Sequence, residues 1–234
     1  MRRALLHPSF VLFLKFLEFL DIFNYPRVPQ FIQYHHNNAF KRLQSPCYKM
    51  TTSSNVKEIE GDLFAMPEGT ALIHACNCKG TWGGGIAKTF YTKYPAAFKV
   101  YQSFCADFEK NPHYLTTTQP SGDEVQVRLP EGHALIIPPQ PADYEKRTGK
   151  KHWIICLFTS YGWGLNVSSP AAILRNTETA LADLKTQLRE SQYAEIAGLY
   201  ACQINSVLFK VNWNLTKQKM EQAGLNITVV SLPS

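Results

Sequence analysis

The stretch HACNCKGTWGGGIAKTF, residues 74–90, combines the residue types most able to do chemistry in this chain. It offers an imidazole at His74, a carboxamide at Asn77, thiols at Cys76 and Cys78, and glycines just ahead of a helical pattern. Unpaired backbone N–H groups and the positive end of the dipole favour anions at a helix N-terminus, and glycines let a ligand approach the backbone closely. The stretch therefore predicts a site for phosphate or a similar anion.

Two familiar nucleotide motifs do not fit this glycine loop. A P-loop requires Gly-Lys-Ser/Thr, but Ala87 precedes Lys88. The dinucleotide fingerprint fails as well, because Lys88 occupies its third glycine position. A purely structural turn therefore remains an alternative on these residues alone.

His74 is the first candidate for a general acid or base, because imidazole titrates near neutral pH. The alternative, a core histidine that points away from any cleft, stays open. Asn77 cannot transfer protons but can orient a sugar or a water. Covalent catalysis by Cys76 or Cys78 is not expected, because neither begins the C-x5-R loop of cysteine-dependent phosphatases.

We expect no metal and no cofactor. The six cysteines lack paired C-x-x-C spacing, and the seven histidines are dispersed. Cys76 and Cys78 would need two further ligands nearby, so buried packing thiols are the favoured interpretation. The number and spacing of the six cysteines indicate free thiols in a reducing compartment rather than a disulfide scaffold.

The elements that must position these residues alternate between β-rich and helical patterns after residue 55. Strands are predicted at 55–61, 71–77, 133–139, 152–160, 194–204 and 226–232. Helices are predicted at 85–94, 96–110, 169–191 and 213–224. This alternation predicts an α/β fold, a mostly parallel sheet covered on both faces as a three-layer α/β/α sandwich. Ligands in such sheets bind at the carboxyl ends of the strands.

Two connections stand apart from this alternation. Residues 116–132 resemble an inserted ribbon or loop, and residues 138–151 a surface connection. Residues 1–50 also differ, with an apolar but charge-interrupted run that is too short and too charged to span a bilayer. We expect an N-terminal extension there, an apolar helix followed by a loosely structured segment, and neither a signal peptide nor a presequence.

The chain has 234 residues, 45% of them hydrophobic and 18% charged, as in a globular protein with one main core. Its net charge of +6 is scattered rather than gathered in a basic stripe, so no direct nucleic-acid partner is expected. A small phosphorylated ligand needs less positive charge. A monomer suffices for this fold.

A wider set of segments decides between these alternatives: GDLF at 61–64, IHACNCKGTWGGGIA at 73–87, CLFTSYGWG at 156–164 and QINSVLFKVNW at 203–213. In this order they resemble the macro domain, and specifically its fungal ADP-ribose 1″-phosphate phosphatase branch. The resemblance covers about residues 55–234, so a macro domain is assigned to 51–234. It implies a mixed six-stranded sheet with ADP-ribose in a cleft at the strand ends.

The resemblance also implies roles for individual residues. Asp62 matches the acid that accepts a hydrogen bond from the adenine amino group, next to Leu63 and Phe64. The alternative for Asp62 is a turn cap after Gly61. Asn77 matches the residue that binds hydroxyls of the distal ribose. The diphosphate and this ribose are held by a first loop, Gly83, Gly84, Gly85 and Ile86.

A second diphosphate loop is implied at residues 205–211. Its binding residues are Asn205, Ser206, Val207, Leu208 and Phe209, with Phe209 flanking the distal ribose. Val207 and Lys210 stand where the family commonly has glycine, so a Cβ at Val207 is expected to crowd the diphosphate or to shift the backbone. Lys210 could compensate with its charge.

Three functions follow from this resemblance. The first is a phosphatase that removes the terminal phosphate of ADP-ribose 1″-phosphate without a metal. Its substrate is a by-product of tRNA splicing, and the enzyme is expected in the cytoplasm or the nucleus. The second is a hydrolase that removes ADP-ribose from modified proteins. The third is a module that binds ADP-ribose derivatives without turnover.

Overall fold

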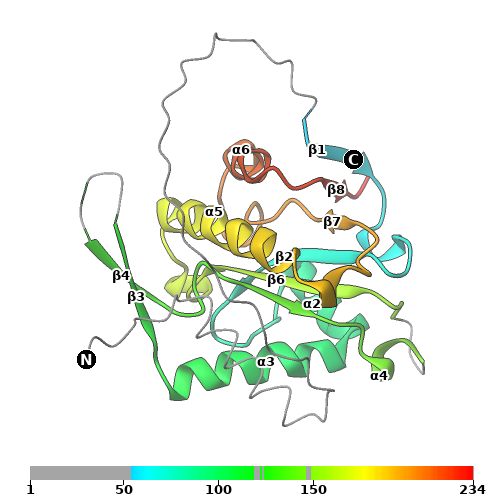
Figure 1. Ribbon diagram of the computed structural model, residues 1–234, viewed down its shortest axis with the longest axis horizontal. Helices are drawn as coiled ribbons and strands as arrows, with labels where there is room; N and C mark the ends of the chain where they lie inside the picture. Colours follow the sequence, from blue (N-terminus) through cyan, green and yellow to red (C-terminus); the bar gives the residue numbers. More distant parts are fainter. Residues whose placement is uncertain (1–53, 119–121, 123, 146–148, 234) are drawn as a thin grey trace, which may run out of the picture. The chain divides into compact units, whose positions relative to one another are not determined.

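The computed structural model describes residues 54–118, 122, 124–145 and 149–233 (Figure 1). The predicted extension, residues 1–50, lies outside the described residues, so its helix and its separation from the domain stay predictions. Within the described part of the chain, no helix is both long enough and apolar enough to cross a membrane.

One six-stranded sheet forms the centre of the domain, with strand order β1-β8-β7-β2-β6-β5. All neighbours run parallel except β5, which pairs antiparallel with β6. This confirms the mixed six-stranded sheet. The strands are β1 (Val56–Glu60), β2 (Ala71–Asn77), β5 (Ala134–Ile137), β6 (Trp153–Ser160), β7 (Leu199–Ala201) and β8 (Ile227–Ser231).

Helices cover both faces of the sheet. In Figure 1, α5 and α6 lie on one side of β2 and β6, and α2 and α3 lie on the other, which gives the predicted three layers. The helices are α2 (Gly85–Lys93), α3 (Pro95–Lys110), α4 (Pro141–Tyr144), α5 (Pro170–Gln187) and α6 (Trp213–Ala223), with short 3-10 turns η1 (Leu63–Ala65), η2 (Gly164–Asn166) and η3 (Ser191–Tyr193).

The helix ends follow from local sequence. Ser169 precedes Pro170 at the start of α5, and its Oγ accepts a hydrogen bond from the backbone N–H of Ala172 at 3.3 Å. Helix α6 ends at Gly224, whose φ of 68° is the left-handed conformation that glycine adopts without strain. Both ends lie close to their predicted positions.

Two predicted segments differ in extent or detail. The predicted strand 194–204 is reduced to the three residues of β7, because residues 194–198 form a turn and an irregular segment and the chain leaves the sheet again after Ala201. The ribbon at 116–132 is an antiparallel hairpin of β3 (Tyr114–Thr118) and β4 (Glu124–Arg128), a separate two-stranded sheet. In the connection at 138–151, Asp143 accepts hydrogen bonds from Ala96 N and Ala97 N, so it caps α3 from α4.

The two faces of the sheet bury different side chains. Towards α5 and α6 the core is aliphatic, with Ile73, Leu157, Leu181 and others fully buried. Towards α2 and α3 it is aromatic: Tyr101 lies between Trp82 and Phe158, with ring centroids 5.0 and 5.9 Å away. Burying one such side chain contributes about 1.5–3 kcal/mol, so this face holds α2 and α3 firmly against β2 and β6.

Candidate functional site

A cleft of about 990 Å³ opens at the carboxyl ends of the parallel strands. This is the place that the sheet topology predicts for a ligand. Its walls are the segments that follow β1, β2, β6, β7 and β8, together with the first turns of α2. The lining residues are 61–64, 75–77, 81–87, 89, 93, 163–164, 202–209 and 230–232.

The first loop brings the start of α2 to the cleft. Gly84 is the N-cap of this helix and no side chain caps it, so the first N–H groups of the helix are available to a ligand. Gly85 has a φ of 54°, which a residue with a Cβ adopts only with strain. Gly83, Gly84, Gly85 and Ile86 all line the cleft, as expected. Their geometry suits an anion bound by backbone N–H groups and the helix dipole.

Asn77 also lines the cleft, at the end of β2, but its carboxamide builds the loop. Its Oδ1 accepts hydrogen bonds from the backbone N–H of Lys79 at 2.9 Å and, more weakly, of Thr81 at 3.4 Å. Its Nδ2 donates to Thr81 O at 2.6 Å. A carboxamide nitrogen carries two hydrogens, so one N–H of Asn77 is left for a ligand. The sequence predicted the position of Asn77 and not its bonds within the loop.

Asp62 combines the two roles considered for it. Its Oδ1 accepts a hydrogen bond from Phe64 N at 2.9 Å and caps η1, so the turn-cap interpretation is confirmed. The residue is nevertheless exposed in the lining of the cleft, beside the buried Leu63 and Phe64. Within the described residues, Oδ2 has no hydrogen-bond partner. An adenine amino group therefore has an acceptor available here.

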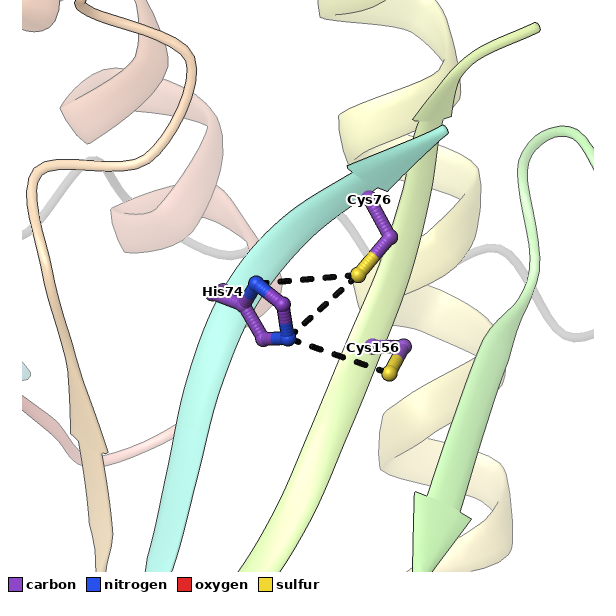
Figure 2. A group of neighbouring side chains, drawn as sticks. All are labelled: His74, Cys76 and Cys156. Atoms are coloured by element: carbon purple, nitrogen blue, oxygen red, sulfur yellow. Dashed lines mark hydrogen bonds between the residues drawn. The ribbon is translucent and has the colours of Figure 1, made fainter. Parts of the chain in front are cut away.

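His74 lies in the core and does not line the cleft, which favours the core-histidine alternative over a catalytic role. Its side chain is fully buried, and its ring stacks on Phe90 with centroids 4.1 Å apart and meets Trp82 edge-on at 4.8 Å. Figure 2 shows its ring nitrogens facing the sulfurs of Cys76 and Cys156. His74 precedes the cleft-lining part of β2, so the alternative of a core histidine is the one that the geometry supports.

The second loop is held by its ends. Asn205 at one end is buried and has a φ of 65°. Its Oδ1 accepts a hydrogen bond from Thr159 Oγ1 at 2.8 Å, and its Nδ2 donates one to Thr177 Oγ1 at 2.9 Å. At the other end Lys210 has a φ of 55°, and Val211 N donates to Asn205 O at 3.1 Å. The side chain of Asn205 thus anchors the loop to β6 and α5 and is not free for substrate.

Left-handed backbone in this loop falls at Asn205 and Lys210 and not at Val207. Among the described residues, these two are the only non-glycine ones with positive φ, so Val207 has an ordinary backbone. Its side chain is 78% exposed. Val207 thus shows no left-handed backbone, and the crowding of a diphosphate by its side chain stays a prediction. Lys210 does take the conformation for which glycine is common.

The rest of the second loop reaches over the first. A Cβ placed on Gly84 or Gly85 would lie 3.3 or 3.2 Å from Leu208 Cδ1, so Leu208 covers the backbone of both glycines. Phe209 lines the cleft, and its place beside the distal ribose stays a prediction. Ser206 lines it too, but its hydroxyl donates to Gln203 O at 2.6 Å within the loop.

Several cleft residues were not assigned from the sequence, and three of them have large side chains. Lys93, in the last turn of α2, brings a cation to the cleft, and its Nζ lies 5.6 Å from the centre of the Phe64 ring. Trp82 forms a buried wall, and Trp163, 55% exposed, lies at the rim. Trp82 and Trp163 belong to the sequence segments that resemble the macro domain, and this membership could have identified them as cleft residues. Lys93 lies in an ordinary helical pattern that gave no such signal.

The cleft contains few ionisable side chains. Among the described lining residues they are Asp62, Lys93 and the thiols of Cys76 and Cys202. Burial raises the pKa of Cys202 to about 12 and that of Cys76 well above its usual range. Both thiols are therefore neutral at pH 7 and poor nucleophiles, in line with the expectation that covalent catalysis is not used.

Solved structures with the same arrangement include macrodomains. The macrodomain of Mycobacterium tuberculosis DarG has a TM-score of 0.55 at 20% identity, covering 78% of this chain and 100% of that one. Thermosipho africanus DarTG, solved in complex with ADP-ribose, has a TM-score of 0.53 at 17% identity, covering 77% of this chain and 42% of that one. At such identities the likeness concerns the fold, and the fold is that of a macrodomain.

Curated relatives are much closer in sequence. The ADP-ribose 1″-phosphate phosphatase of Aspergillus oryzae is 50% identical over 190 residues, covering 76% of this chain and 94% of the relative. That of Aspergillus fumigatus is 51% identical over 189 residues, with the same coverage. No family model matches the chain. The chain belongs to the family of the fungal ADP-ribose 1″-phosphate phosphatases.

Proposed function

We propose that this protein hydrolyses the terminal phosphate monoester of ADP-ribose 1″-phosphate and yields ADP-ribose and phosphate. The observation that carries the proposal is the membership in a phosphatase family at about 50% identity, over nearly the whole length of those relatives. The cleft adds physical support, because its volume of about 990 Å³ is ample for a dinucleotide-sized ligand.

The ligand is best placed with adenine at Asp62 and phosphates at the loops. The free Oδ2 of Asp62 accepts the adenine amino group, while Leu63 and Phe64 supply apolar contacts. The start of α2 binds the diphosphate through backbone N–H groups. The remaining N–H of Asn77 donates to the distal ribose or its phosphate.

The hydrolysis itself depends on positioning and on electrostatic stabilisation. Water attacks phosphorus, the bond between phosphorus and the C1″ oxygen breaks, and one proton of the water ends on the leaving oxygen. Among the described residues, no imidazole lines the cleft to carry that proton. The proton therefore passes through the phosphate oxygens or solvent, while backbone N–H groups of the first loop stabilise the charge on the phosphoryl group.

Two alternatives are a module that binds ADP-ribose derivatives without turnover and a hydrolase that removes ADP-ribose from proteins. The absence of a histidine among the described cleft residues favours binding without turnover. Neither candidate changes the placement of adenine and diphosphate. The proposal also includes a link to tRNA splicing and a cytoplasmic or nuclear location. It further includes a monomeric state and no direct contact with nucleic acid.

The deciding experiment measures phosphate release from ADP-ribose 1″-phosphate by the full chain, next to the affinity for ADP-ribose. Gly85→Val should reduce both at least tenfold, because the new side chain meets Leu208 and strains the backbone where phosphate binds. Gly122→Val is the matched control, since Gly122 also has a positive φ, of 91°, but no atom of the described residues lies within 4 Å of its Cβ position. Saturable binding without phosphate release from the wild type would replace the phosphatase with the binding module.

A further inference from the structure

Three potential metal ligands converge in the core beneath the cleft. His74 and Cys76 come from β2, and Cys156 comes from β6, where it lies directly opposite His74 in the parallel register (Figure 2). Their exposed fractions are 0, 2 and 0%. Spacing along the sequence does not reveal this group, because Cys156 is 82 positions from His74.

The distances from His74 Nε2 to the two sulfurs are close to the nitrogen–sulfur distance of a tetrahedral zinc site. Nε2 of His74 lies 3.4 Å from Cys76 Sγ and 3.9 Å from Cys156 Sγ, and all the potential ligand atoms lie within 4.8 Å of one another. Zinc bonds of about 2.3 Å to sulfur and about 2.0 Å to nitrogen, at tetrahedral angles, separate nitrogen from sulfur by about 3.6 Å. Nδ1 of His74 also lies 3.7 Å from Cys76 Sγ, so this sulfur lies beside the ring and not in line with the lone pair of Nε2. A single ion therefore reaches all three residues only after the imidazole or the Cys76 side chain rotates.

The surroundings of His74 point the same way. A buried imidazole ordinarily finds an oxygen or nitrogen partner. Among the described residues, the ring nitrogens of His74 have only the two sulfurs as partners. Thiols are weak hydrogen-bond donors and acceptors, so the ring is poorly satisfied by them. Thiolates bound to a metal would give Nε2 a strong partner in the shared ion.

The net charge of the buried site favours a divalent over a monovalent metal ion. Phe90 and Trp82 enclose His74 with apolar surface, where a net charge is costly. Two thiolates, a neutral imidazole and a divalent ion sum to zero, whereas a monovalent copper ion would leave a buried negative charge. Sulfur and imidazole ligands also suit zinc, and three protein ligands leave it a fourth position.

We propose that His74, Cys76 and Cys156 bind one Zn²⁺ ion. Binding requires both thiols to lose a proton, so two protons are released for each ion and the affinity rises with pH. The ion joins β2 to β6 just before Asn77 and stabilises the fold by mass action. This proposal is independent of the phosphatase proposal, because its readouts are metal content, spectrum and stability.

The test is titration of the metal-free full chain with Co²⁺ under anaerobic conditions, followed by displacement with Zn²⁺. One equivalent of Co²⁺ should give a thiolate charge-transfer band and the visible bands of a tetrahedral site, and one equivalent of Zn²⁺ should remove them. Cys156→Ser and Cys76→Ser should each lose these bands. Cys105→Ser is the matched control, a buried cysteine outside the three-residue group, and should keep them.

Two further measurements establish which thiols bind the ion. Cys47→Ser should also keep the bands, which excludes a site at that thiol. Zn²⁺ should raise the melting temperature of the wild type and not that of Cys156→Ala, which tests the site even if the serine variants fold poorly. A wild type that shows no cobalt–thiolate band, or bands that survive both Cys76→Ser and Cys156→Ser, would overturn the proposal.

Discussion

The hydroxyl of Tyr101 donates a hydrogen bond to the backbone oxygen of Asn77 over 2.7 Å, and the same hydroxyl accepts one from Thr81 N at 3.2 Å. A helix side chain from α3 thus holds the end of β2 and the start of the first loop. The register of β2 with β6 shifts between Cys76 and Asn77, so this end of the strand lacks regular pairing. Tyr101 compensates for that irregularity.

Tyr101→Phe should therefore lower both stability and ligand affinity. The loss of a buried hydroxyl that makes two hydrogen bonds costs about 1–3 kcal/mol of unfolding free energy, measurable by urea denaturation. Affinity for ADP-ribose, measured by calorimetry, should fall several-fold. Tyr94→Phe is the control: it removes the buried hydroxyl that bonds to His152, so it should lose stability but retain affinity. Equal affinities of both variants would remove Tyr101 from this role.

Asp62→Asn should separate the adenine role from the capping role. The amide oxygen can still accept from Phe64 N, so stability should change little, but the amide nitrogen cannot accept the adenine amino group. We expect about a tenfold weaker affinity for ADP-ribose, equivalent to about 1.4 kcal/mol. Ribose 5-phosphate, which lacks adenine, should bind both proteins alike. A selective loss for that ligand would contradict the assignment.

Lys93→Met should weaken binding through its charge. The ammonium group of Lys93 is a cation at the cleft wall, where it attracts a diphosphate over several ångströms. Calorimetry at low and high salt should show a several-fold weaker affinity and a smaller dependence on salt. Lys99→Met, at an exposed position of α3, is the control and should leave both unchanged. An unaltered salt dependence in the Lys93 variant would argue against contact with phosphate.

His74→Ala should act on stability rather than on proton transfer. Removal of a fully buried ring stacked on Phe90 should cost about 2–5 kcal/mol of unfolding free energy. Well below the melting temperature, the dependence of kcat on pH should keep its shape. A general acid or base contributes 10²–10⁴-fold, so a loss of about 100-fold together with a vanished limb of the pH profile would restore His74 as a catalytic residue.

Stability should fall on mild acidification because of His152. Burial lowers the pKa of His152 below its ordinary value of 6.5, and the ring bonds to Tyr94 and to the backbone oxygen of Met66. The unfolded chain takes up the proton first, so this contribution is present above about pH 6.5 and is lost as pH falls from there towards the folded pKa. Histidine NMR should give a pKa below that ordinary value, and His152→Asn should reduce the change in melting temperature across this range.

The sequence predicted the elements well because their signals are local. The Ser169 cap and Gly224 fix the ends of two helices, and the glycine loop after β2 marks the start of a third. The cleft followed from the resemblance and from the rule that ligands bind at strand ends.

What the sequence could not predict depends on side-chain direction and distant neighbours. The strand pattern alone did not determine which face of the sheet the side chain of His74 lies on. The bonds of Asn205 to Thr159 and Thr177, 46 and 28 positions away, have no local signature. The meeting of Cys156 with His74 required knowledge of the β2–β6 register.

The contact of Leu208 with Gly84 and Gly85 also bears on the speed of turnover. The leucine side chain is 58% exposed and bridges the two loops with apolar contacts alone, so parting the loops breaks no hydrogen bond of that side chain. Opening the loops here therefore costs only apolar contacts, and that cost depends on the size of one side chain. If the product of the proposed reaction leaves between these loops, this contact sets part of the barrier to its release.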